Sequence, residues 1–246
     1  MLKNKTAIIT GSNRGIGFEI LKKMSENGAY IIACARKKDE NFEKKIEEIQ
    51  NKYKNQIKPI YFDLLNEKEI ERALKEINEL NFNIEILVNN AGINQVSLFQ
   101  MTSIQKIKEI FQVNFFSQLQ FTQKIIKMMI KNKKGSIINI SSNAALEWDI
   151  VRSAYASSKA ALIAFTKVLS KELGAFNIRT NSIAPGLTNT EMMEKNISKK
   201  IIDETINKIP FKRPANPEEI SNVAIFLASD LSTYVNGETI FVTGGY

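Results

Sequence analysis

The sequence predicts a single α/β domain built on a doubly wound, Rossmann-like parallel sheet of about seven strands. Short apolar segments alternate with helical segments along nearly all of the 246 residues. The apolar segments lack the polar–apolar alternation of a half-exposed strand, which indicates a sheet buried on both faces. Helices between successive strands give right-handed crossovers. No Pro-, Gly- or Ser-rich linker divides the chain.

Seven short apolar runs are the predicted strands. In chain order they are Thr6–Thr10, Tyr30–Ala35, Lys58–Phe62, Ile86–Asn89, Ser136–Ile140, Arg179–Ala184 and Thr239–Val242. The segments between them are predicted to be helical, the first because its apolar residues recur on one face. These segments are Gly15–Asn27 (stopped by Gly28), Glu40–Tyr53, Glu67–Leu80 (capped by Asn66), Ser103–Lys131, Ala154–Leu173, Glu191–Lys195, Ser198–Asn207 and Pro217–Ala228.

The composition excludes several kinds of chemistry and partner. The chain has no histidine, so it lacks the usual general base near pH 7 and the Ser-His-Asp triad. Its one cysteine, Cys34, cannot form a disulfide framework or a zinc cluster, and no metal site is expected. No apolar run approaches the roughly 18 residues of a membrane span, and no signal peptide precedes the first strand. We therefore expect a cytoplasmic protein without membrane contact.

The net charge of +8 does not predict a nucleic-acid partner. Lysines are scattered over nearly every predicted helix, and no known nucleic-acid-binding motif is present. A solvated basic surface explains this charge better than a binding patch for an anionic partner.

Tyr155 and Lys159 are the strongest candidates for a catalytic pair. On a helix, residues four apart point from the same face. An ammonium group near a phenol favours the phenolate and lowers its pKa from about 10. A hydroxyl from Ser141 or Ser142 can hold a substrate oxygen against the phenol, so that a proton moves to or from a carbonyl or carbinol. The alternative is a buried tyrosine and a solvated lysine on an ordinary amphipathic helix.

A glycine-rich turn between the first strand and the first helix predicts a nucleotide site. Glycines let the backbone approach a pyrophosphate, and the helix N-terminus offers free N–H groups. The turn has the spacing Gly-x-x-x-Gly-x-Gly. Its residues are Thr10, Gly11, Ser12, Asn13, Arg14, Gly15, Ile16 and Gly17.

The ends of the next strands suggest which nucleotide binds. After the second strand the chain offers Arg36, Lys37 and Lys38, with no acid before Asp39. A carboxylate at this point holds the ribose hydroxyls of NAD, whereas cations attract a 2′-phosphate. NADP(H) is therefore favoured over NAD(H), with Arg14 approaching the same phosphate; the alternative is a solvated basic loop.

Two further strand ends complete the expected nucleotide site. Asp63, followed by Leu64, can accept a hydrogen bond from an adenine amino group. Asn89 and Asn90 can tie strands together, and the small residues Ala91 and Gly92 allow close approach of a ribose.

Together these motifs resemble the short-chain dehydrogenases/reductases over essentially the whole chain. The resemblance rests on the glycine turn, Asn89-Asn90-Ala91-Gly92, Asn114, Ser142, Tyr155-xxx-Lys159, Pro185-Gly186 and the terminal Gly244-Gly245. It implies that Tyr155 is the general acid/base, that Lys159 lowers the tyrosine pKa and binds the nicotinamide ribose, and that Ser142 orients the substrate carbonyl. Asn114 would hold a relay water, and Pro185, Gly186 and Thr188 would cradle the nicotinamide.

Within that family the chain looks most similar to the 3-oxoacyl-[acyl-carrier-protein] reductases. The expected substrate is a small-molecule or carrier-protein-linked ketone, under a lid at about 187–211 that carries Met192, Met193 and several isoleucines, with Leu146 and Trp148 opposite. The alternative is that these residues only pack the lid helices onto the sheet. Two features differ from that branch: Gln95-Val96 stands where an Arg-Asp pair is usual, and Phe176 where a basic docking residue is usual. Lys133 and Lys134 could supply a basic docking site beside the active-site mouth instead.

Other interpretations of the same motifs stay open. Enzymes acting on sugars, steroids or small ketones share them, and a non-catalytic NADP-binding regulatory protein is possible on this fold. The small residues of the catalytic helix and the exposed apolar set expected on the long helix predict a homotetramer or homodimer; that set is Phe115, Phe116, Leu119 and Phe121. The alternative is that these phenylalanines pack in the core.

Overall fold

The computed structural model describes residues 1–147, 150–196 and 198–246. Its middle layer is a seven-stranded sheet in the order β3-β2-β1-β4-β5-β6-β7, with every neighbouring pair parallel. The strands are β1 (Thr6–Thr10), β2 (Tyr30–Ala35), β3 (Ile57–Tyr61), β4 (Ile84–Asn89), β5 (Gly135–Ile140), β6 (Ile178–Pro185) and β7 (Thr239–Val242). The predicted doubly wound fold is confirmed, and the strand order reverses between β1 and β4, where such sheets bind ligands.

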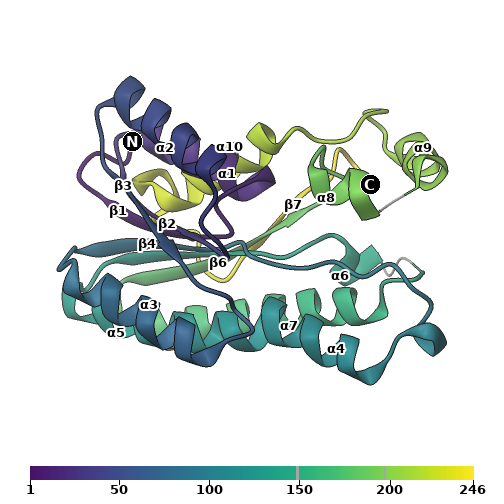
Figure 1. Ribbon diagram of the computed structural model, residues 1–246, viewed down its shortest axis with the longest axis horizontal. Coiled ribbons are helices and arrows are strands. Elements are labelled where there is room, and N and C mark those ends of the chain that lie inside the picture. The colour runs from purple at the N-terminus through teal and green to yellow at the C-terminus, as the bar shows by residue number, and fades with distance from the viewer. Residues whose placement is uncertain (148–149, 197) are drawn as a thin grey trace.

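Helices cover both faces of the sheet (Figure 1). One face carries α1 (Gly15–Glu26), α2 (Glu40–Tyr53) and α10 (Pro217–Ala228), and the other carries α3 (Glu67–Glu79), α5 (Ser117–Asn132) and α7 (Ser153–Leu173). Shorter helices are α4 (Ile104–Phe111), α6 (Ala144–Glu147), α8 (Glu191–Asn196) and α9 (Lys199–Lys208), with single turns at Phe99–Met101, Gly174–Phe176 and Asp230–Ser232. In the described part of the chain, no helix combines the length and apolarity that a membrane crossing needs.

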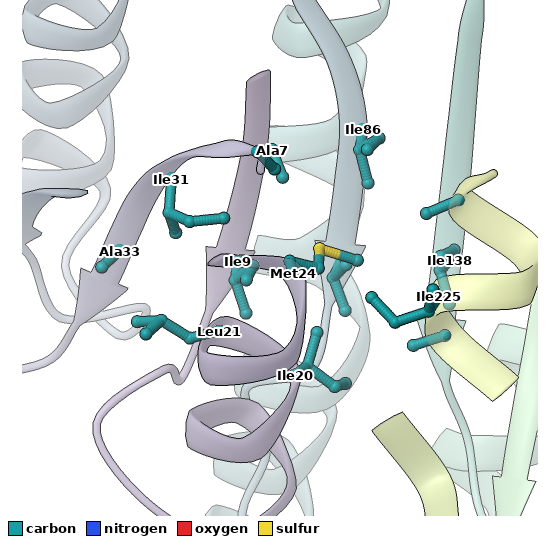
Figure 2. Close-up of a cluster of buried hydrophobic side chains, with 14 of the residues drawn as sticks. Ala7, Ile9, Ile20, Leu21, Met24, Ile31, Ala33, Ile86, Ile138 and Ile225 are labelled. Atoms are coloured by element: carbon teal, nitrogen blue, oxygen red, sulfur yellow. The ribbon is translucent and has the colours of Figure 1, made fainter. Parts of the chain in front are cut away.

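Two apolar clusters hold these layers together. On one face, strand residues such as Ile9 and Ile31 point toward Leu21 and Met24 of α1 (Figure 2). On the other face, Phe62 and Phe121 stack with ring centroids 5.4 Å apart. Complete burial of these side chains supplies most of the driving force for the layered fold.

Phe121 corrects one expectation drawn from the sequence. It was assigned to an exposed apolar set on the long helix, but its side chain is fully buried against Phe62. Phe116 is exposed as expected, while Phe115 and Leu119 are half-buried.

The predicted continuous helix 103–131 is also wrong in one respect. A π-helical turn, Gln112–Phe116, separates α4 from α5. Such a turn inserts an extra residue into the helical repeat and commonly marks a functional position. Here it contains Asn114, whose side chain is completely buried.

Candidate active site

A cleft of about 560 Å³ opens at the carboxyl ends of β1, β2, β4, β5 and β6. All but two of the predicted site residues line it. These are Thr10, Gly11, Asn13, Arg14, Gly15, Ile16, Gly17, Arg36, Asp63, Leu64, Asn90, Ala91, Gly92, Ser142, Tyr155, Lys159, Pro185, Gly186 and Thr188. Residues from widely separated parts of the chain therefore meet in one cavity because parallel strands end at the same edge of the sheet.

The glycine turn is shaped so that only glycine fits at two of its positions. Gly11 has a φ of +65°, and a Cβ there would lie 2.8 Å from the Ala91 Cα. A Cβ on Gly17 would lie 2.2 Å from the carbonyl oxygen of Gly11. The first N–H groups of α1 have no side-chain cap from Arg14. The turn thus offers a bare backbone and a helix N-terminus, which suit a pyrophosphate.

Thr10 and Asn90 fasten this turn to the end of β4. The Thr10 hydroxyl accepts from the backbone N–H groups of Asn90 (3.0 Å) and Ala91 (3.1 Å). The Asn90 amide donates to the carbonyl oxygens of Thr10 and Gly11, both at 3.0 Å. Deeper in the sheet, Asn89 donates to Asn139 and so ties β4 to β5. Both asparagines therefore join strands, as the sequence analysis predicted.

Ser12 lies in the turn but does not line the cleft. Its hydroxyl and its backbone N–H both donate to the Cys34 carbonyl, at 3.0 Å, and its side chain is fully buried. Ser12 therefore joins the glycine turn to β2. Its predicted cofactor contact is not provided by the side chain.

The basic residues that follow β2 in the sequence also lie together at the cleft in the structure. Arg36, Lys37 and Lys38 line the cleft and are exposed. Asp39, the first acid after the strand, caps α2 by accepting from the Phe42 N–H at 3.0 Å. Asp39 lines the cleft too, but one of its carboxylate oxygens is engaged in the helix cap, so three basic side chains face a single, partly engaged acid at this point.

Arg14 lines the cleft and pairs with an acid of the predicted lid. Its guanidinium lies 3.4 Å from the Glu191 carboxylate, so the ion pair joins the glycine turn to helix α8 of the predicted lid. Both side chains are more than half exposed, and such a pair contributes little to stability. Asp63 keeps its expected place, with one carboxylate oxygen accepting from the Leu65 N–H at 2.9 Å.

Tyr155, Ser142 and Lys159 converge at the other end of the cleft. Tyr155 lies in the first turn of α7 and is hydrogen-bonded to the Ser142 side chain. The Lys159 Nζ lies 6.0 Å from the centre of the Tyr155 ring, one turn further along the helix. Ser141 instead donates to the Lys159 carbonyl at 2.9 Å and is buried. Of the two candidate serines, Ser142 is the one beside the phenol.

Burial sets the protonation of this pair. It raises the pKa of Tyr155 above its usual value, while the Ser142 hydrogen bond and the Arg152 charge lower it by smaller amounts. Burial also lowers the pKa of Lys159 from 10.5 to about 8. The net change at Tyr155 is opposite to the lowering expected from Lys159, because burial disfavours the charged form of both groups. The phenol is consequently held in its protonated form at neutral pH.

Lys159 and Asn114 are fixed by backbone groups. The Lys159 Nζ donates to the Ile140 carbonyl at 2.7 Å. Asn114 accepts from the Ile93 N–H (2.8 Å) and donates to the Ile93 carbonyl (3.0 Å) and to Ser158 (3.1 Å). It lies behind Gly92 instead of lining the cleft, with both Asn114 and Lys159 close to that glycine.

The chain after β6 forms the wall beside Tyr155. Gly186 donates to the Val242 carbonyl at 2.9 Å, and a Cβ there would lie 3.0 Å from the Thr243 Cα. Thr188 is buried and donates to the Gly186 carbonyl at 2.9 Å. This packing holds the segment against the end of β7.

Several other expectations about the surroundings of the site need correction. Lys134 pairs with Glu85 at 3.5 Å, and both it and Lys133 precede β5, at the amino end of the sheet and opposite the cleft. Leu146 is half-exposed and does not line the cleft. Trp148 and Ile197 lie outside the described residues.

Other residues that line the cleft were not predicted from the sequence. They are Asn94, Asn143, Arg152, Glu191 and Tyr246, among others. Asn94, Asn143 and Arg152 lie within a few residues of recognised motifs, and this proximity could have identified them. No sequence signal points to Tyr246. No group of three or more His, Cys, Asp or Glu side chains with metal-binding geometry occurs among the described residues.

Known proteins are similar to this chain over nearly its whole length. A family model described as Enoyl-(Acyl carrier protein) reductase matches residues 11–246. The chain is 38% identical to a 3-oxoacyl-[acyl-carrier-protein] reductase of Aquifex aeolicus (99% of this chain, 98% of the relative). It is 36% identical to a 3alpha-hydroxysteroid dehydrogenase of Mediterraneibacter gnavus (99% and 97%).

A solved structure shows the same fold with a nucleotide present. It is a 3-oxoacyl-[acyl-carrier protein] reductase from Brucella melitensis with bound NAD, similar at a TM-score of 0.90 and 27% identity, covering 99% of this chain and 91% of that one. The full-length matches and the site together settle the family. The chain belongs to the short-chain dehydrogenases/reductases, oxidoreductases that act on CH–OH and C=O groups with a nicotinamide cofactor.

Proposed function

We propose that this protein is an NADPH-dependent ketone reductase whose substrate is a 3-oxoacyl thioester, either small or attached to a carrier protein. The observation that carries the proposal is the convergence of Tyr155, Ser142 and Lys159 at one end of a cleft whose other end is a glycine turn. A nicotinamide dinucleotide held by the glycine turn would supply the hydride at the end of the cleft where Tyr155 lies.

The cofactor is held by backbone more than by side chains. The glycine turn receives the pyrophosphate, the segment Asn90–Gly92 receives the ribose, and Asp63 with Leu64 receives the adenine. Pro185, Gly186 and Thr188 contact the nicotinamide, whose bound reduced form supplies the hydride. The bare cradle around Gly11 and Gly17 supports this placement, since a side chain at either position would fill it.

Tyr155 delivers the proton that completes the reduction. As hydride reaches the ketone carbon, the C=O π electrons move to oxygen, and that oxygen takes the proton from the Tyr155 hydroxyl. The raised pKa of Tyr155 keeps this proton in place at neutral pH. Ser142 donates to the same oxygen, and Lys159 stabilises the phenolate that remains. Asn114 orders the path by which solvent returns the proton.

The preference for NADPH over NADH rests on the end of β2. Arg36 lines the cleft there, and Asp39, the acid that follows it, is engaged as a helix cap. A guanidinium pairs bidentately with a phosphate, so Arg36 is the group we assign to the 2′-phosphate. Arg14 assists only if it leaves Glu191.

The segment after β6 brings apolar side chains to the substrate end of the cleft. Leu187, Met192, Met193 and Thr205 line it from the segment 187–211, which we assign as the lid over a single catalytic domain. Methionine adapts to varied apolar surfaces, as an acyl chain requires. The name of the Aquifex aeolicus relative supports a thioester of this class. The lone cysteine, a buried free thiol, suits a reducing cytoplasm.

A steroid or other small ketone is the second candidate. Lys133 and Lys134 lie at the far end of the sheet, which removes the docking site expected for an acidic carrier. The Mediterraneibacter gnavus relative acts, by its name, on a hydroxysteroid.

A substrate panel separates these candidates. NADPH oxidation is followed with an acetoacetyl thioester, a carrier-linked oxoacyl chain, a ketosteroid and a keto-sugar. We expect turnover with the thioesters. Inert thioesters together with an active steroid or sugar would refute the substrate assignment but leave the catalytic residues in place.

A further inference from the structure

The helix that carries Tyr155 begins without a cap from the side chain of its own N-cap residue. The first N–H groups of a helix have no partner within it, and a preceding side chain commonly caps them. Helices α2, α3 and α4 are capped in this way by Asp39, Asn66 and Ser103. In α7 the residue at the capping position is Arg152, whose side chain makes no such bond.

A residue far away in the sequence supplies the missing acceptor. The Gln95 Oε1 accepts from the backbone N–H of Ala154 at 3.2 Å, next to Tyr155. Gln95 is 5% exposed and Ala154 is 4% exposed, so water does not compete for this bond. A buried N–H without an acceptor is costly, which makes the contact important for the first turn of α7.

The other end of the same amide holds the loop that follows β4. The Gln95 Nε2 donates to the Ser97 carbonyl at 3.0 Å and to the Thr102 hydroxyl at 2.7 Å. The Ser97 N–H in turn donates to the Val151 carbonyl at 2.8 Å, immediately before α7. One side chain therefore joins the loop 94–102 to the start of the catalytic helix.

We propose that Gln95 is a positioning residue that fixes the first turn of α7 and so sets the Tyr155 hydroxyl against Ser142 and the substrate carbonyl. This inference rests on the proposed catalytic role of Tyr155. The primary amide accepts from the helix through its oxygen and donates to the loop through its nitrogen. The glutamine thus has a function at the place where the sequence departs from the Arg-Asp pair of similar reductases.

Three variants test the proposal. Gln95→Met keeps the shape and removes all three hydrogen bonds, whereas Gln95→Glu keeps the acceptor for Ala154 and loses the two donated bonds. Thr166→Val is the matched control, because it removes a buried hydrogen bond to Asn139 from the middle of the same helix. The measurements are kcat and KM for the ketone, the Kd of NADPH, and hydrogen exchange of the Ala154 amide.

For Gln95→Met we expect kcat to fall by on the order of 10- to 100-fold, because small displacements of a reacting group are costly. The Kd of NADPH should change by less than about twofold, and Ala154 should exchange at least about tenfold faster. Compared with Gln95→Met, Gln95→Glu should show slower hydrogen exchange of the Ala154 amide and a higher kcat. Thr166→Val should keep the kcat of the wild type.

Several results would overturn the positioning role. They are an unchanged kcat in Gln95→Met, an equal loss of kcat in Thr166→Val, or a loss of NADPH binding as large as the loss of kcat. If Gln95→Met does not fold, Gln95→Glu decides, and rapid exchange of Ala154 in that variant contradicts the contact. A wild-type protein inactive on every ketone refutes the proposed function instead, while exchange at Ala154 still tests the contact.

Discussion

At the scale of single residues, Lys159 combines a functional position with an energetic cost. Its ammonium is buried, and that burial lowers its pKa from 10.5 to about 8. The unfolded chain therefore binds more protons than the folded chain between these pH values, so this residue makes stability rise with pH across that window. Below pH 8 the cost is fully present, at most on the order of 3 kcal/mol.

Replacing Lys159 by methionine should reveal this cost. We expect the stability of Lys159→Met relative to wild type to be greatest below pH 8 and to shrink toward pH 10.5, since the wild-type lysine becomes neutral. Loss of the Ile140 hydrogen bond offsets part of the gain, by about 1 kcal/mol. Urea unfolding of both proteins at pH 7 and pH 10 measures the trend. A difference that does not vary with pH would contradict the buried charge.

Arg36 makes a second prediction at this scale. Arg36→Asp should raise KM for NADPH and improve kcat/KM for NADH relative to NADPH, because a carboxylate repels the 2′-phosphate and accepts from ribose hydroxyls. Lys44→Asp, on the exposed face of α2, makes the same charge change outside the cleft and should leave the ratio unaltered. A wild-type preference for NADH would show that the end of β2 was misinterpreted.

At the scale of elements, the glycine turn predicts that Gly17→Ala lowers stability, which is the opposite of what helix propensity alone predicts. Alanine is the better helix former by about 1 kcal/mol, so Gly17→Ala in α1 would stabilise an unconstrained helix. The Cβ would instead lie 2.2 Å from the Gly11 carbonyl and force the turn open. We expect a lower Tm and weakened NADPH binding.

Gly174→Ala provides the matched control. Gly174 has helical dihedral angles and no atom within 4 Å of an added Cβ. Gly174→Ala should leave the free energy of unfolding unchanged or raise it by up to about 1 kcal/mol. Thermal melts and NADPH titrations compare the two variants, and equal behaviour would remove the steric argument for the turn.

The elements also show what a sequence can predict. The apolar runs predicted the ends of all seven strands to within two residues. They could do so because a strand that is buried on both faces is apolar along its own short segment of sequence. The break at Gln112–Phe116 was missed, since a π turn keeps the helical pattern of apolar residues on both sides. Contacts such as Gln95 to Ala154 and Arg14 to Glu191 join distant segments and have no local pattern. The site residues were predictable from motifs, but the groups that orient them were not.

At the scale of the whole molecule, we propose that the protein is a homotetramer or homodimer. Phe116 at the start of α5 and Val168 on α7 are both more than half exposed. Phe115 packs edge-on against both Phe116 and Phe165, which makes the apolar surface continuous across the two helices. Exposed apolar patches of this kind mark association surfaces.

Sedimentation measures the assembly directly. We expect a species with a multiple of the 27.8-kDa chain mass at micromolar concentration, and a shift toward monomer in Phe116→Asp. Wild-type protein that sediments only as a monomer would refute the assembly.

The central claim is that Tyr155 donates the proton in ketone reduction, and one substitution tests it most directly. Tyr155→Phe keeps the ring and removes the hydroxyl that bonds to Ser142. Tyr61→Phe is the control, because it removes a tyrosine hydroxyl that bonds Glu43, away from the cleft. We predict that kcat of Tyr155→Phe falls by on the order of 10²- to 10⁴-fold while NADPH binds nearly as before, and that Tyr61→Phe stays active. Normal turnover by Tyr155→Phe would contradict the account.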